Sequence, residues 1–137
     1  MVAAKKNPYN NYHNDKVFTA SNEELVLMLY DGALKFTNVA IMALEKDPKD
    51  DYEKAAEAII RVQKIIKEFQ VTLDRQYTIS DELYNIYDYL FRRLVQASLR
   101  KEIPILEEIR DMIRELRDTW KEAMKIAKSE GSISTAK

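Results

Sequence analysis

Cysteine is absent from the 137-residue sequence, and glycine and proline are scarce, with two and three residues respectively. Without cysteine, neither disulfide bonds nor thiol chemistry is possible. Glycine and proline are the strongest breakers of regular structure, so their scarcity indicates a mostly helical chain. The length is that of a single domain.

Long hydrophobic runs are also lacking. No apolar run approaches the ~20 residues that a membrane-spanning helix needs. The N-terminal MVAAKKNPY does not contain the apolar segment of a secretory signal. We therefore expect a cytoplasmic protein that makes no membrane contact.

The sequence also has no large net charge, because it contains 22 basic and 23 acidic residues. This balance argues against binding to nucleic acid or to an anionic membrane surface, since both require a basic patch. A partner is then expected to be recognised mainly through shape and apolar contact.

Histidine occurs once, as His13, in the non-helical opening stretch. A di-metal site in a helical bundle needs Glu-x-x-His motifs on two helices, and a serine nucleophile needs a base. No glycine-rich phosphate loop is present, and the carboxylates lie among lysines and arginines on polar faces. We expect no catalytic residue, cofactor, metal or small-molecule substrate, and therefore no enzyme. A metal-dependent bundle enzyme is an alternative that the histidine count disfavours.

Four segments have the periodicity of amphipathic helices. The first helix is predicted to begin at about residue 22, after Ser21 and Glu24 form a capping box, and to end before Pro48. Asp50 and Glu53 repeat this pattern before the second helix.

The third helix is predicted to follow Ser80 as its N-cap, and the fourth to open at Pro104, where proline is favoured. Four such helices with short connections predict an all-α fold, namely an antiparallel up-down four-helix bundle. The predicted boundaries are an extended N-terminal segment at residues 1–20, the bundle at 21–128, and a flexible tail at 129–137.

Apolar residues exceed what one buried face of each helix requires. On the first two helices, the stripes predicted to form the core are Leu25, Met28, Leu29, Gly32, Phe36, Val39 and Ala43, and then Ala56, Ile59, Ile60, Gln63, Ile66 and Leu73. A second set of apolar residues lies beside each stripe. It predicts a thick core with apolar surface left over, a groove for helices of another chain, or a homodimer seam. Gly32, inside a helix, predicts a close approach of a neighbouring backbone or ligand.

The segments NPYNNYHNDKVFTAS, EELVLMLYDGALKF, LYNIYDYLFRRLVQAS and RDTWKEA occur in this order. In order, spacing and residue identity they resemble the FliS family of flagellar export chaperones, from Asn7 to about Lys128. One departure is Asn22, where many relatives have proline. That change removes a favoured proline but leaves the capping box intact.

The resemblance implies a cytoplasmic chaperone that binds the C-terminal segment of flagellin in apolar grooves. It also implies that the chaperone prevents premature polymerisation and aids delivery to the flagellar type III secretion apparatus. The implied partners are therefore flagellin and components of the export apparatus. The residues predicted to form the groove are Tyr30, Ile65, Phe69, Tyr84, Tyr87, Phe91 and Val95.

In this family the N-terminal segment folds back over part of the groove, and Tyr9 and Tyr12 match its tyrosines. Burying two tyrosines offers ~3–6 kcal/mol, whereas ordering the backbone of NPYNNY costs about 6–12 kcal/mol. The cap is therefore expected to be marginal and easily displaced. The alternative function is a self-associating helical bundle without a foreign client.

Overall fold

The computed structural model describes residues 22–46 and 52–135. Within these ranges the chain forms four helices: α2 (Asn22–Glu45), α3 (Tyr52–Thr72), α4 (Thr78–Arg100) and α5 (Ile103–Thr135). The predicted all-α fold is confirmed. The predicted extended segment at residues 1–20 and the caps Ser21 and Asp50 lie outside the described residues.

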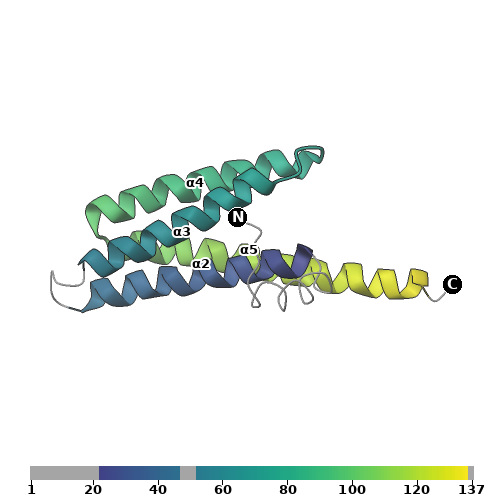
Figure 1. The fold of residues 1–137 in the computed structure, drawn as a ribbon, viewed down its shortest axis with the longest axis horizontal. Coiled ribbons are helices and arrows are strands. Elements are labelled where there is room, and N and C mark those ends of the chain that lie inside the picture. The colour runs from purple at the N-terminus through teal and green to yellow at the C-terminus, as the bar shows by residue number, and fades with distance from the viewer. Residues whose placement is uncertain (1–21, 47–51, 136–137) are drawn as a thin grey trace, which may run out of the picture.

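The helices run alternately up and down (Figure 1), and their contacts form a closed ring. α2 packs against α3 and α5, and α4 packs against the same two helices. The core between them contains Ile59, Ile66, Leu90, Leu94 and Ile109, all of which are fully buried. Ile59 and Ile66 on α3, and Leu90 and Leu94 on α4, recur at helical spacing, so each of these two helices contributes a buried stripe.

The stripe predicted for α2 is only partly the one that is buried, since Ala43 is buried and Leu29, Phe36 and Val39 pack against the core. Tyr30, Ala33 and Ala40 face the core, whereas Met28 is 62% exposed. On α3 the assignment is also partly wrong, because Val62 and Phe69 are buried and Ile60 is 47% exposed. Both helices are apolar on more than one side, so the periodicity alone could not decide which side faces the neighbouring helices.

The prediction that Ser80 caps α4 is wrong. The helix begins at Thr78 after Tyr77, which provides no side-chain cap. Ser80 is buried in the first turn, and its hydroxyl donates to the backbone carbonyl of Asp74 in the α3–α4 connection. The serine therefore ties the connection to the helix that follows it.

The α4–α5 packing includes a polar cluster. Tyr89 Oη donates to Glu108 Oε2 at 2.5 Å, and Arg93 Nε donates to Glu108 Oε1 at 2.8 Å. The tyrosine hydrogen bond, together with Arg93, holds the pKa of the Glu108 carboxyl below its usual value. Between these helices, Lys101 adopts a left-handed conformation with φ 56°, and its N–H donates to the Ala97 carbonyl.

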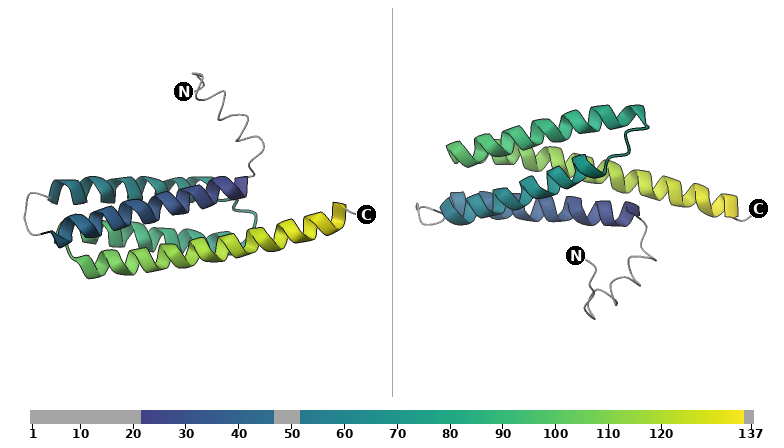
Figure 2. Two further views of the ribbon diagram at one scale, coloured as in Figure 1. Left: turned by 90° about the horizontal axis from the view of Figure 1, so that it is seen from below. Right: turned by 45° about the horizontal axis from the view of Figure 1, so that its top comes forward.

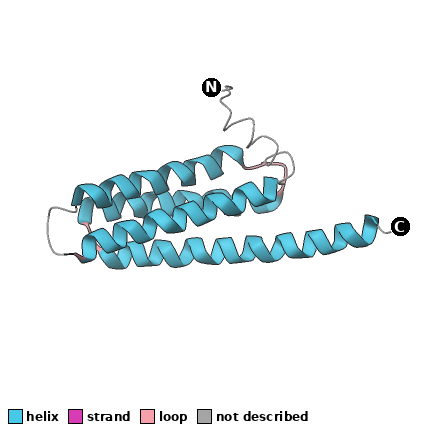
Figure 3. Ribbon diagram, turned by 60° about the horizontal axis from the view of Figure 1, so that its bottom comes forward, coloured by secondary structure: helices cyan, strands magenta, loops and turns pink. Residues whose placement is uncertain are grey.

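α5 continues well past the start of α2 (Figure 2), and Figure 3 shows the same overhang from another side. Where α5 passes the start of α2, Trp120 Nε1 donates to the Glu23 carbonyl at 2.8 Å, and Arg117 pairs with Asp31. The backbone is helical as far as Thr135, beyond the predicted boundary at residue 128. The flexibility predicted for residues 129–137 stays a prediction.

The length and composition of α2 bear on the expectation that the protein makes no membrane contact. Among the described residues, Glu23–Glu45 is long and apolar enough to span a membrane by length and composition. A core helix of a soluble bundle passes the same test, and α2 packs against both α3 and α5.

Candidate protein-binding grooves

Three of the predicted groove residues form an aromatic cluster inside the bundle. Tyr30 of α2, Phe69 of α3 and Tyr87 of α4 are each less than 5% exposed. The ring centroids of Tyr30 and Phe69 are 4.5 Å apart, and those of Phe69 and Tyr87 are 5.1 Å apart and stacked. Such ring contacts add to the stability gained from burial. Because the three rings come from three helices, the cluster stabilises the packing of α2, α3 and α4.

The two tyrosine hydroxyls of this cluster satisfy each other. Tyr30 Oη and Tyr87 Oη lie 2.6 Å apart, and either can be the donor. Burial raises the pKa of Tyr87 above its ordinary value. Burial likewise raises the pKa of Tyr30, and the neighbouring Tyr87 adds to the effect. Both hydroxyls therefore stay neutral at physiological pH.

A cavity of about 580 Å³ lies directly over this cluster, at the end of the bundle where α5 runs past α2. We call it the end cavity. All four helices contribute to its mostly apolar lining, which also includes the α3–α4 connection. Its lining residues are Val26, Tyr30, Phe69, Thr72, Leu73, Asp74, Ile79, Leu83, Tyr87, Glu115, Leu116, Thr119, Trp120 and Ala123.

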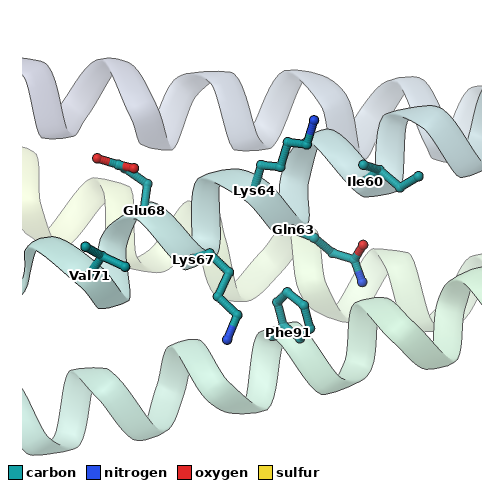
Figure 4. Close-up of a pocket in the computed structure, with 7 residues that line it drawn as sticks. All are labelled: Ile60, Gln63, Lys64, Lys67, Glu68, Val71 and Phe91. Atoms are coloured by element: carbon teal, nitrogen blue, oxygen red, sulfur yellow. The ribbon is translucent and has the colours of Figure 1, made fainter. Parts of the chain in front are cut away.

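A second hollow lies on the surface between α3 and α4 (Figure 4) and has a volume of about 360 Å³. We call it the α3–α4 groove; its lining residues are Ile60, Gln63, Lys64, Lys67, Glu68, Val71 and Phe91. Phe91 projects from α4 toward α3, and Lys67 projects toward Phe91. The Lys67 ammonium lies 4.7 Å from the ring centroid, so a cation–π contact covers the ring.

A third hollow, of about 510 Å³, lies between α2 and α3. We call it the α2–α3 groove; its lining residues are Phe36, Glu57, Ile60, Arg61, Lys64 and Ile65. Gly32 borders it, since a Cβ added there would lie 3.5 Å from Ile65 Cδ1. That is ordinary contact with a side chain, so within the described part of the chain no neighbouring backbone approaches Gly32 closely. The predicted backbone approach is wrong.

The seven predicted groove residues are therefore divided among several places. Tyr30, Phe69 and Tyr87 form the floor of the end cavity, whereas Ile65 and Phe91 line separate surface grooves. The other two are on α4. Tyr84 is half-buried beneath the Arg75 guanidinium, 4.7 Å away, and Val95 is 38% exposed.

Several apolar residues at these sites were missed from the sequence. Leu116 and Trp120 line the end cavity, and Ile60 and Val71 line the α3–α4 groove, where Val71 is 79% exposed. The signal was their apolar character. Ile60 was predicted to belong to the core stripe of α3, and Leu116 and Trp120 are apolar residues of α5 that border the core rather than fill it.

The grooves offer apolar contact surface. Among residues 22–46 and 52–135, no group of three His, Cys, Asp or Glu side chains is placed to hold a metal ion. Each groove is open to solvent and has exposed apolar side chains beside charged ones. Such a surface is suited to binding amphipathic segments of another protein.

The fold and its grooves define an all-α four-helix bundle with several apolar hollows between its helices. The model of the family described as "Flagellar protein FliS" matches residues 5–127. The chain belongs to this family.

Curated relatives agree with this assignment. The chain is 41% identical over 121 residues to the flagellar secretion chaperone FliS of Bacillus subtilis, covering 88% of this chain and 89% of the relative. It is 30% identical to the flagellar secretion chaperone FliS of Escherichia coli, covering 79% of each chain. The Salmonella typhimurium protein of the same name is 32% identical, with 77% of this chain and 78% of the relative covered. The family thus supports a role as a flagellar export chaperone.

Proposed function

We propose that this protein is a cytoplasmic export chaperone for flagellin. It binds the C-terminal segment of flagellin, prevents premature polymerisation, and aids delivery to the flagellar type III secretion apparatus. The observation that carries the proposal is the set of apolar hollows around a FliS-family bundle, above all the end cavity with its aromatic floor.

The energetics suit a client that is disordered before it binds. Burial of apolar side chains contributes ~25 cal/mol per Å², while ordering the client offsets ~2–5 kcal/mol or more of that gain. Three separate hollows let an extended client bury apolar residues at several points. The binding is non-covalent and requires no cofactor.

The N-terminal segment is part of the proposal. We infer that Tyr9 and Tyr12 compete with the client for an apolar hollow. The described chain starts at Asn22, one turn before Val26, which lines the end cavity. The end cavity is therefore within reach of the preceding residues.

The test is complex formation with flagellin, followed by size-exclusion chromatography and calorimetry. The wild-type protein should form a 1:1 complex that is lost when the C-terminal segment of flagellin is deleted. Phe91→Glu should weaken binding by about 100-fold or more, because a carboxylate in an apolar contact loses its hydration.

Asn85→Glu is the matched control, because it adds the same charge at an exposed position on α4. It should bind normally, and circular dichroism should show both variants folded. A complex that persists without the C-terminal segment would refute this binding mode. Unchanged binding by Phe91→Glu would remove the α3–α4 groove from the client site.

A further inference from the structure

The two surface grooves meet on the exposed side of α3. Ile60 and Lys64 line both of them, so the α2–α3 groove and the α3–α4 groove adjoin along this helix. Ile60, Lys64, Lys67 and Val71 follow one another at spacings of four, three and four residues, which places them along one side of the helix. We call these residues the α3 track. It spans about 16 Å, the length of a three-turn helix.

The cations on this side of α3 are not neutralised by ion pairs within the described part of the bundle. Among the described residues, Arg61, Lys64 and Lys67 have no carboxylate within ion-pair distance, whereas arginines of α4 and α5 pair with Asp88, Glu108, Asp111 or Asp31. Two of these cations cover aromatic rings instead. Arg61 lies 5.2 Å from the Phe36 centroid, and Lys67 lies 4.7 Å from the Phe91 centroid.

These positions constrain the chemistry of an occupant. An apolar side chain that reaches Phe36 or Phe91 must displace the cation above the ring and thereby break a cation–π contact. A carboxylate beside that apolar side chain would give the displaced cation a new partner. A segment without carboxylates would have to break the same contacts without this compensation.

Glu57 and Glu68 restrict where such carboxylates can lie. Each lines one of the two grooves, and Figure 4 shows Glu68 on the other side of α3 from Lys67. A client carboxylate next to Glu57 or Glu68 would be repelled. The favourable places are therefore beside Lys67 over the α3–α4 groove and beside Arg61 over the α2–α3 groove.

We propose that Arg61, Lys64 and Lys67 determine client specificity, and that the α3 track binds an amphipathic helical segment whose apolar side chains are flanked by carboxylates. The inference rests on the proposed function, since the segment is taken to be part of the flagellin C-terminal region. The cations select for acidic flanks, and the apolar residues supply most of the affinity.

The test compares Lys64→Gln/Lys67→Gln with Lys121→Gln/Lys125→Gln by titration calorimetry against the isolated C-terminal segment of flagellin. Both double variants remove two charges, and the control pair is exposed on α5. The α3 variant should bind about fivefold more weakly at low salt, and the difference should shrink at high salt because exposed ion pairs are screened. The control should bind as the wild-type protein does.

A second arm changes the client instead. The same segment with its Asp and Glu residues replaced by Asn and Gln should bind the wild-type protein more weakly and should no longer distinguish it from the α3 variant. Equal binding by both double variants, with the same salt dependence, would overturn this inference and leave the proposed function standing. If the wild-type protein fails to bind flagellin at all, the proposed function and this inference both fall.

Discussion

At the scale of single residues, the Tyr30–Tyr87 pair is the most consequential polar contact in the core. Both rings were predicted as groove residues, and a buried tyrosine needs a hydrogen-bond partner for its hydroxyl. In the folded bundle each hydroxyl satisfies the other at 2.6 Å, so both rings can be buried. Their location beneath the end cavity means that substitution here affects stability as well as the shape of the cavity floor.

We predict that Tyr30→Phe and Tyr87→Phe each lower the free energy of unfolding by ~1–3 kcal/mol, because each leaves one buried hydroxyl without a partner. The double variant should lose less than the sum of the two single losses, since neither hydroxyl is then left unpaired. Urea unfolding of all four proteins gives the coupling free energy. Strictly additive losses would contradict the hydrogen-bonded pair.

The same pair predicts an alkaline limit to stability. In the unfolded chain tyrosine ionises near pH 10, whereas burial raises the pKa of both side chains in the folded state. The stabilisation is therefore complete below about pH 10 and is lost as the pH rises above that value, because the unfolded chain can release protons that the folded one retains. Urea midpoints measured across this range should fall less steeply for the double phenylalanine variant than for the wild-type protein.

At the scale of helices, α2 shows why a helix can be predicted correctly while its core face is predicted only in part. Its apolar residues occur on more than one side, so the 3.6-residue period was clear while the inward side was not. Packing against both α3 and α5 buries Tyr30, Ala33 and Ala40 and leaves the side with Met28 and Gly32 on the surface or in the α2–α3 groove. The sequence therefore predicted that α2 carries a second set of apolar residues beside the main stripe. It could not predict which of these residues face the core and which face a groove.

Gly32 provides a prediction at this scale. Gly32→Ala should stabilise the bundle by ~0.5–1 kcal/mol, because alanine favours the helix and its Cβ makes only ordinary contact with Ile65 Cδ1 at 3.5 Å. If the client occupies the α2–α3 groove, the added methyl group should also reduce flagellin affinity. Thermal unfolding and calorimetry measure the two effects separately. A destabilised variant would show that the position is more tightly packed than this contact indicates.

At the scale of the whole molecule, the end cavity lies where all four helices and the α3–α4 connection meet. Beyond this point α5 continues past the start of α2 (Figure 2). Trp120 and Leu116 line the end cavity rather than a closed core. An apolar client segment or the preceding residues of this chain would complete the packing there.

We predict that deletion of residues 1–18 leaves the bundle folded by circular dichroism and increases self-association or binding of an apolar dye. Flagellin affinity should be unchanged or stronger if the segment only competes with the client. A large loss of affinity would show that these residues contact flagellin directly. Analytical ultracentrifugation of the full chain decides the alternative, because a monomer at micromolar concentration would exclude a homodimer seam.

The sequence by itself determined the helices, their antiparallel order and the family, because helical periodicity, breakers and motif order are local properties of the chain. Only the tertiary structure decided that Tyr30, Phe69 and Tyr87 form one buried cluster, that Ser80 ties down a connection, and that apolar hollows remain between the described helices. The physical reason is that burial depends on which sides of neighbouring helices meet. A helix that is apolar on several sides leaves that choice to its neighbours.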